Sequence, residues 1–93
     1  MAAQPHPPSA PDIDAALRAL LAETLGLAGA RVASFTDGTE LFGSLPEFDS
    51  MAVANLLTGL EERFGVLIED SDVEAEDFAT WGSLRAFVER LSA

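Results

Sequence analysis

The sequence predicts an all-α fold: a small antiparallel four-helix bundle with three main helices, a short third helix and a long loop between the first two helices. Apolar residues recur at helical spacing in three segments, and no segment shows the strict apolar–polar alternation of a strand. The chain has 93 residues, of which 48% are hydrophobic. That is enough for one domain with a single core and too little for two.

A proline-rich stretch at residues 1–11 is expected to form a disordered tail, because proline lacks a backbone donor and has a fixed torsion. The domain should therefore span residues 12–93. Its first helix should begin at Asp12 or Asp14, whose carboxylates suit the positive end of a helix, and end near Gly26. The apolar face of this helix comprises Ile13, Leu17, Leu20 and Leu21.

Residues 26–49 form a long connection in which glycines and one proline interrupt any helical period. Its apolar residues indicate that it packs onto the core, with one short helical turn expected at residues 40–43. The second main helix is expected at residues 50–64, where apolar side chains recur every four residues. Asp49 should cap this helix and Gly65 should end it.

The remainder of the chain is predicted to contain the short helix and the last main helix. After an extended stretch, residues 74–78 should form one or two helical turns. Thr80 should cap the last helix, which is expected at residues 81–91. Its apolar positions are Trp81, Leu84, Phe87, Val88 and Leu91.

The formal charge of the chain is −11, and residues 47–93 carry most of it. There is no lysine, and the five arginines are scattered. Nucleic acid and anionic lipid are excluded as partners because both need clustered basic residues, so basic protein surfaces are expected instead. The chain has no cysteine, no leader-like segment and no membrane-length apolar run, which predicts a soluble cytoplasmic protein without a membrane span.

The residues that could catalyse a reaction or bind a metal do not form a site. The acidic run at residues 70–74 lacks the glycine and the final carboxylate of a calcium loop. A structural zinc needs more than the single histidine, His6, since there is no cysteine. Ser50 has no histidine in the folded region to act as its base, and the adjacent Glu61 and Glu62 point apart on a helix. We therefore expect neither an enzyme nor a metal site.

Ser50 stands where the long loop gives way to the apolar helix. A serine at that place could simply cap the helix. However, Asp-Ser-Met at residues 49–51, followed by Leu-Glu-Glu-Arg-Phe-Gly at residues 60–65, resembles the attachment motif and second helix of the acyl carrier protein family. The likeness spans about residues 12–92 and is strongest over residues 47–68.

The resemblance implies an acyl carrier protein that is itself no enzyme. A phosphopantetheinyl transferase would move 4'-phosphopantetheine from coenzyme A onto the hydroxyl of Ser50, with Asp49 and Met51 beside the attached arm. The arm would hold acyl intermediates as thioesters and present them to partner enzymes of lipid metabolism or fatty acid biosynthesis. Its thiol would account for the lack of cysteines in the chain.

The resemblance also implies where partners and cargo bind. Glu47, Glu61 and Glu62, together with Asp49, would meet basic patches on acyl ligases, synthases or acyltransferases, with the carrier acting as a monomer. The acyl chain would enter between the helices. The expected acyl pocket consists of Leu60, Phe64, Ile68, Phe78, Leu84 and Val88.

Some residues depart from the carriers of general fatty acid synthesis. Ala52, Asn55 and Arg63 interrupt the acidic pattern of those carriers. The run Leu-Phe-Gly-Ser-Leu-Pro-Glu-Phe-Asp-Ser-Met at residues 41–51 looks like carriers encoded with exosortase and exopolysaccharide systems. Two alternatives stay open: an aminoacyl or peptidyl carrier of a nonribosomal pathway, and an unmodified acidic adaptor that binds a protein. The sequence names neither the cargo nor the partner enzymes.

Overall fold

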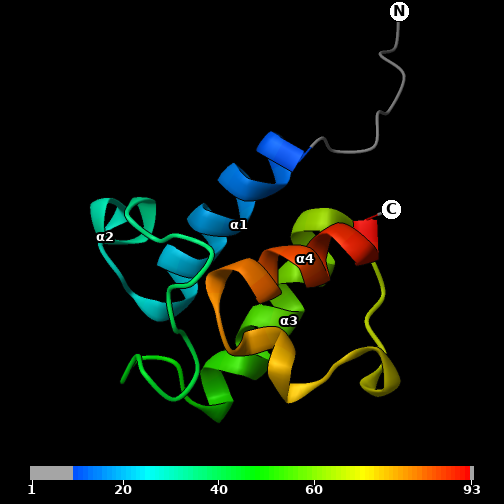
Figure 1. Ribbon diagram of the computed structural model, residues 1–93. Helices are drawn as coiled ribbons and strands as arrows, with labels where there is room; N and C mark the ends of the chain where they lie inside the picture. Colours follow the sequence, from blue (N-terminus) through cyan, green and yellow to red (C-terminus); the bar gives the residue numbers. More distant parts are fainter. Residues whose placement is uncertain (1–9, 93) are drawn as a thin grey trace, which may run out of the picture.

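The computed structural model describes residues 10–92 as helices and loops around one core (Figure 1). The elements are α1 (Ala10–Leu25), α2 (Gly29–Ala33), α3 (Ser50–Phe64), the 3₁₀ turns η1 (Asp70–Asp72) and η2 (Ala75–Phe78), and α4 (Trp81–Ser92). Within these described residues there is no β-strand, only an isolated bridge between Glu40 and Thr80. The predicted all-α bundle, with its long first connection and weak third helix, is confirmed.

The start of α1 differs from the prediction. The helix begins at Ala10 rather than at Asp12 or Asp14, so the tail predicted for residues 1–11 was too long. Pro11 fits in the first turn because the amides of that turn have no partner inside the helix, and its missing N–H therefore removes no hydrogen bond. The rest of the predicted tail, with its histidine, lies outside the described residues.

The connection between α1 and α3 contains α2, a helix of 5 residues that the sequence did not predict. A helix this short, with Val32 as its single buried residue, shows no helical period of apolar residues in the sequence. The helical turn predicted at residues 40–43 was wrong. Glu40 lies in the bridge with Thr80, and a non-helical turn follows at residues 42–44.

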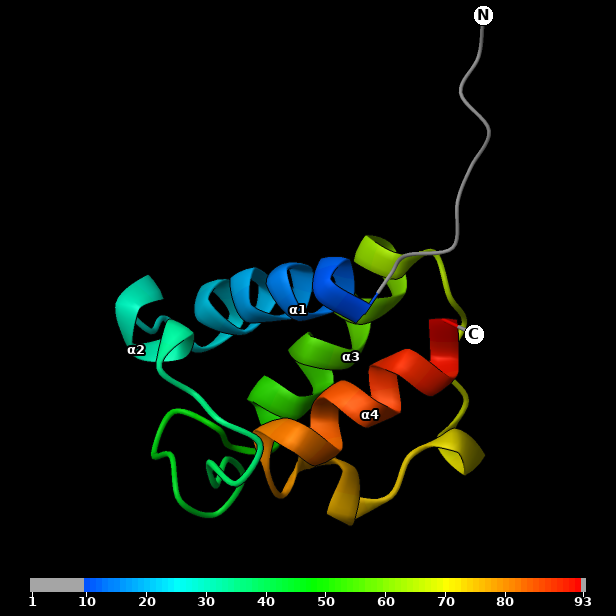
Figure 2. The ribbon, with the colours of Figure 1, turned by 45° about the horizontal axis from the view of Figure 1, so that its top comes forward.

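The core is formed by the three longer helices together with the long connection. α1 packs against α2, α3 and α4, and α4 also packs against η2. Figure 2 shows the three longer helices next to one another, and α1 contacts both of the others. The largest fully buried side chains are Trp81, Phe87, Leu17, Leu21, Leu41, Leu56, Leu60, Leu84, Val32 and Val88. Because Val32 and Leu41 belong to the connection, the prediction that it packs onto the core is confirmed.

The predicted bounds of α3 and the predicted start of α4 are confirmed, while α4 continues one residue beyond the predicted end, to Ser92. Gly65 ends α3 with a φ of 64°, in the left-handed region that favours glycine. At the start of α4, the Ser83 N–H donates to Thr80 Oγ1 at 3.1 Å, and the Thr80 N–H donates to Ser83 Oγ at 3.1 Å. This reciprocal pair fixes the first turn of the helix.

The segment between α3 and α4 is expected to open more readily than α3. It consists of extended stretches and the two 3₁₀ turns, and among residues 66–79 only Phe78 is buried. Few buried contacts give low local stability, so amides of residues 69–79 should exchange with solvent about tenfold faster than amides in the middle of α3. Hydrogen exchange followed by nuclear magnetic resonance measures this directly, and equal rates in the two regions would contradict it.

Candidate functional site

Ser50 is the first residue of α3, and its side chain is exposed. Within the described part of the chain its hydroxyl makes no hydrogen bond. The capping role belongs to Asp49, whose Oδ1 accepts a hydrogen bond from the Ala52 N–H at 2.8 Å. The interpretation of Ser50 as a simple helix cap is therefore wrong, and the hydroxyl is available for another role.

The amide groups at the start of α3 favour a negative group on this serine. The carboxylate and the carbonyl of Asp49 accept from the Ala52 and Val53 N–H groups, at 2.8 and 3.0 Å. Among the described residues, no acceptor is found for the N–H groups of Ser50 and Met51. These two donors and the positive end of the helix dipole can stabilise a phosphodiester on the Ser50 oxygen.

The chain just before Ser50 is anchored to the rest of the fold. Phe48 is 3% exposed, and its ring meets the ring of Phe78 edge-on at a centroid distance of 6.2 Å. Next to it, Glu47 pairs with Arg31 of α2 at 3.2 Å. These contacts hold the end of the long connection, so the first turn of α3 has a defined position.

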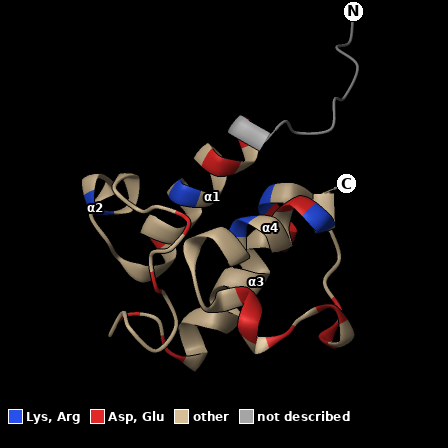
Figure 3. Cartoon of the chain, in the orientation of Figure 1, with Lys and Arg blue, Asp and Glu red and all other residues tan. Residues whose placement is uncertain are grey.

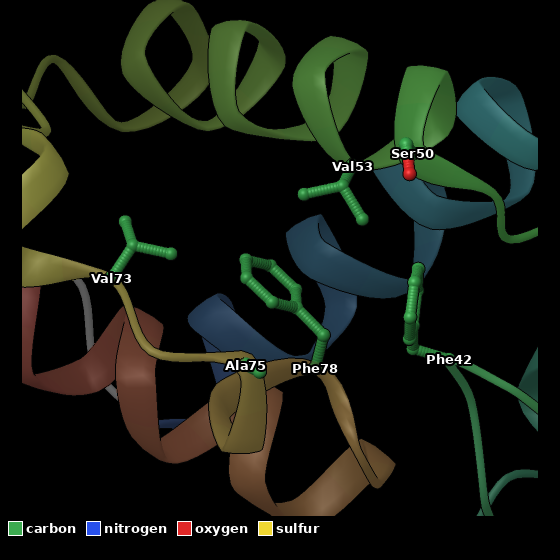
Figure 4. A pocket seen from close by; sticks show the side chains of 6 residues that line it. All are labelled: Phe42, Ser50, Val53, Val73, Ala75 and Phe78. Carbon is green, nitrogen blue, oxygen red and sulfur yellow. The ribbon is translucent and has the colours of Figure 1, made fainter.

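A pocket of about 260 Å³ opens beside Ser50 (Figure 4). We call it the Ser50 pocket. Figure 4 shows α3 on one side and the segment that contains η2 on the other, with their side chains facing each other across the opening. The lining is mostly carbon, which suits an apolar guest. The residues that line it are Phe42, Ser50, Val53, Val73, Ala75 and Phe78.

The Ser50 pocket differs from the acyl pocket expected from the sequence, since the two sets share only Phe78. The other expected residues lie in or against the core, with Leu60, Leu84 and Val88 fully buried and Phe64 and Ile68 half-buried. Val53 follows Ser50 by three residues and so lies on the same face of α3. Its place beside Ser50 could therefore have been predicted from the sequence spacing. Phe42, Val73 and Ala75 come from irregular segments without such a signal.

The four acidic residues predicted to meet partners are not equally available. Glu47 pairs with an arginine of α2, and Asp49 caps α3. The carboxylate of Glu61 accepts a hydrogen bond from the Ile68 N–H at 2.9 Å, which fixes the chain after α3. Glu62 is exposed and has neither a hydrogen bond nor an ion pair from its side chain within the described residues. Met51, the predicted apolar contact, is 73% exposed.

Negative charge is concentrated near the Ser50 pocket. Each of the five arginines pairs with a carboxylate of the described residues. Figure 3 shows acidic residues gathered along the segment between α3 and α4, which contains no basic residue. Val73 and Ala75, which line the pocket, belong to this segment. A basic partner that approaches the pocket would therefore be attracted.

Part of the acidic segment between α3 and α4 has a structural role. The carboxylate of Asp72 accepts from the Glu69 N–H at 3.0 Å, and that of Asp77 accepts from the Glu74 N–H at 2.9 Å, so the acidic side chains cap η1 and η2.

Across residues 10–92 no group of three potential metal-ligating side chains is found. In the same part of the chain no helix is long and apolar enough to cross a membrane.

Comparison with known proteins identifies the class of the protein. A family model described as the phosphopantetheine attachment site matches residues 15–91, so the chain belongs to this family of non-catalytic carriers, which bind 4'-phosphopantetheine covalently. Among solved structures, the chain is similar to a holo acyl carrier protein from Nitrosomonas europaea. The two share 42% sequence identity with a TM-score of 0.73, over 84% of this chain and 92% of that chain. The fold and sequence are thus those of the acyl carrier protein family. No match is found among curated proteins.

Proposed function

We propose that this protein carries acyl groups as thioesters on a 4'-phosphopantetheine arm attached to Ser50, and presents them to partner enzymes. The observation that supports this most directly is the exposed Ser50 hydroxyl, which has no hydrogen bond within the described residues and lies at the rim of an apolar pocket. When bound, the arm supplies the thiol that the chain itself lacks.

The residues around Ser50 have separate roles in this proposal. On a transferase, Ser50 Oγ attacks the phosphorus of coenzyme A that carries the pantetheine. The new O–P bond replaces the pyrophosphate bond, 3',5'-adenosine bisphosphate leaves, and the hydroxyl proton passes to a base of the transferase. The Ser50 and Met51 N–H groups stabilise the resulting phosphodiester, while Asp49 keeps the helix start in place by holding the Ala52 N–H. The exposed Met51 side chain offers partner enzymes a flexible apolar contact beside the arm.

The Ser50 pocket favours an acyl cargo over an aminoacyl or peptidyl one. Its lining offers almost no polar atoms, so a polar cargo would lose its hydrogen bonds to water without replacement. A dry apolar cavity of about 150 Å³ holds one benzene, so a pocket of about 260 Å³ has room for a chain of about ten carbons. We therefore propose linear acyl chains of short to medium length as cargo.

Intact-mass measurement separates this function from its alternatives. Incubation with coenzyme A and a phosphopantetheinyl transferase should add one phosphopantetheine to the whole chain. An unmodified adaptor would show no mass change. The mass of the group carried by protein isolated from its own cells then distinguishes an acyl from an aminoacyl or peptidyl cargo. Association with exosortase or exopolysaccharide systems, and the monomeric state, stay predictions.

Docking of the transferase and of the acyl-transferring enzymes is proposed to depend on the unpaired acidic side chains. Glu62→Gln should lower the kcat/KM of phosphopantetheinylation about twofold at low salt, because charge complementarity acts mainly on the association rate. The difference should disappear as salt screens the interaction. Ala19→Lys makes the same change in net charge at an exposed position of α1 and is the control. Equal effects of the two variants would place the docking surface elsewhere.

A further inference from the structure

One wall of the Ser50 pocket comes from neither α3 nor the segment before α4. Phe42 belongs to the long connection between α2 and α3, and Figure 4 shows its ring below Ser50 and beside Phe78. The ring is 45% exposed. Among the described residues, only two other large apolar side chains, Met51 and Leu67, are as exposed or more so.

The position of Phe42 is fixed by contacts with two residues of the pocket region. Its ring meets the ring of Phe48 edge-on, with a centroid distance of 5.8 Å and an interplanar angle of 82°. Its backbone N–H donates to the carbonyl oxygen of Phe78 at 3.0 Å. Phe78 also lines the pocket, so this hydrogen bond directly joins two of the segments that form the pocket lining.

The chain that leads to Phe42 is bound to the start of α4 by backbone hydrogen bonds. These run from the N–H groups of Leu41, Trp81 and Gly82 to the carbonyl oxygens of Ala79, Thr39 and Asp37, at 2.8, 2.9 and 3.0 Å respectively. The contact is tight at Gly82, where a Cβ would lie 2.9 Å from the carbonyl oxygen of Asp37.

A side-chain contact reinforces the same junction. The Arg85 guanidinium pairs with Asp37 at 2.8 Å, and this hydrogen bond is the main reason that the pKa of Arg85 is raised. Phe42 thus stands at the end of a segment held from residue 37 onward. Because the backbone that carries Phe42 is held in this way, the ring can clear the path of a guest only by rotating away from Phe48.

On the basis of the proposed function, we propose that Phe42 is a specificity-determining residue of the Ser50 pocket. Its ring closes the Ser50 end, so that a linear acyl chain can be covered while a chain branched near the thioester is excluded. A linear chain that packs on the exposed part of the ring removes apolar surface of Phe42 from water. This stabilisation adds to that from burying the methylenes of the chain. A branched chain would have to displace a ring that packs edge-on against Phe48 and whose backbone is hydrogen-bonded to Phe78.

The test measures how well the protein shields a thioester. The whole chain is loaded by a phosphopantetheinyl transferase with acetyl, octanoyl or 2-methyloctanoyl groups from the corresponding coenzyme A esters, and cleavage by hydroxylamine is followed by intact mass. In the natural sequence, with each rate divided by that of the corresponding coenzyme A thioester, the octanoyl group should be cleaved more slowly than the other two. Phe42→Ala should speed cleavage of the octanoyl group about five- to tenfold. Leu67→Ala, which truncates a side chain 77% exposed and outside the pocket lining, should leave all three rates unchanged.

The outcomes separate this inference from the proposed function. If the natural sequence gains no mass, the proposed function fails, and the inference with it. If it is loaded but octanoyl and acetyl groups are cleaved alike, the carrier role stands and the inference is overturned. The same holds if octanoyl is shielded equally in Phe42→Ala, or if the natural sequence shields 2-methyloctanoyl as well as octanoyl. Phe42→Leu, which keeps an apolar side chain, should show intermediate shielding and provides the test should the alanine variant not fold.

Discussion

Ser50→Ala should abolish attachment of phosphopantetheine completely. The exposed Ser50 hydroxyl is the oxygen that the proposed chemistry uses, and alanine offers no atom to form the bond. Because Asp49 rather than Ser50 caps α3, the free energy of unfolding should change by less than about 0.5 kcal/mol. Intact mass after incubation with coenzyme A and a transferase measures the modification, and urea denaturation measures the stability.

Ser71→Ala is the matched control for this experiment. Ser71 is exposed and lies in η1, in the acidic segment near the pocket, but it has no Asp-Ser-Met motif around it. This variant should be modified as fully as the natural sequence. A mass gain in Ser50→Ala would show that another side chain carries the arm, and the assignment of Ser50 would have to be abandoned.

Arg18→Leu should produce the largest loss of stability of the substitutions considered. The guanidinium donates to the carbonyl oxygens of Val32 and Phe35, at 2.6 and 3.1 Å, and pairs with Asp14 at 2.8 Å. It also lies over the ring of Trp81, 4.5 Å from its centroid. One side chain of α1 therefore holds both the long connection and α4.

The cost follows from the groups that the substitution leaves behind. Without Arg18 the Phe35 carbonyl loses the donor that the structure gives it, and hydrogen bonds from charged groups carry more energy than neutral ones. We expect a loss of about 2–4 kcal/mol in the free energy of unfolding, measured from urea denaturation. Arg63→Leu removes an exposed pair with Glu23 and should cost less than about 1 kcal/mol. Equal losses for the two variants would contradict the role given to Arg18.

The sequence by itself determined the fold class, the extent of α3 and the family. These features are local. Asp49 and Gly65 cap and end α3 through their own backbone surroundings, and the apolar stripe of α3 follows from its spacing. The attachment motif is likewise a contiguous run around Ser50, so its recognition needs no tertiary information.

Only the tertiary structure decided what surrounds Ser50. Phe42 reaches the pocket because the connection is hydrogen-bonded to residues 78–82, far away along the chain, and no local period encodes such pairing. For the same reason the sequence missed α2, whose single buried residue is too little to form a pattern. Nor did the sequence indicate that the carboxylate of Glu61, predicted to meet partners, accepts a hydrogen bond from the Ile68 N–H. Local rules fix where helices start and stop, but the partners of irregular segments depend on contacts made after the helices have packed.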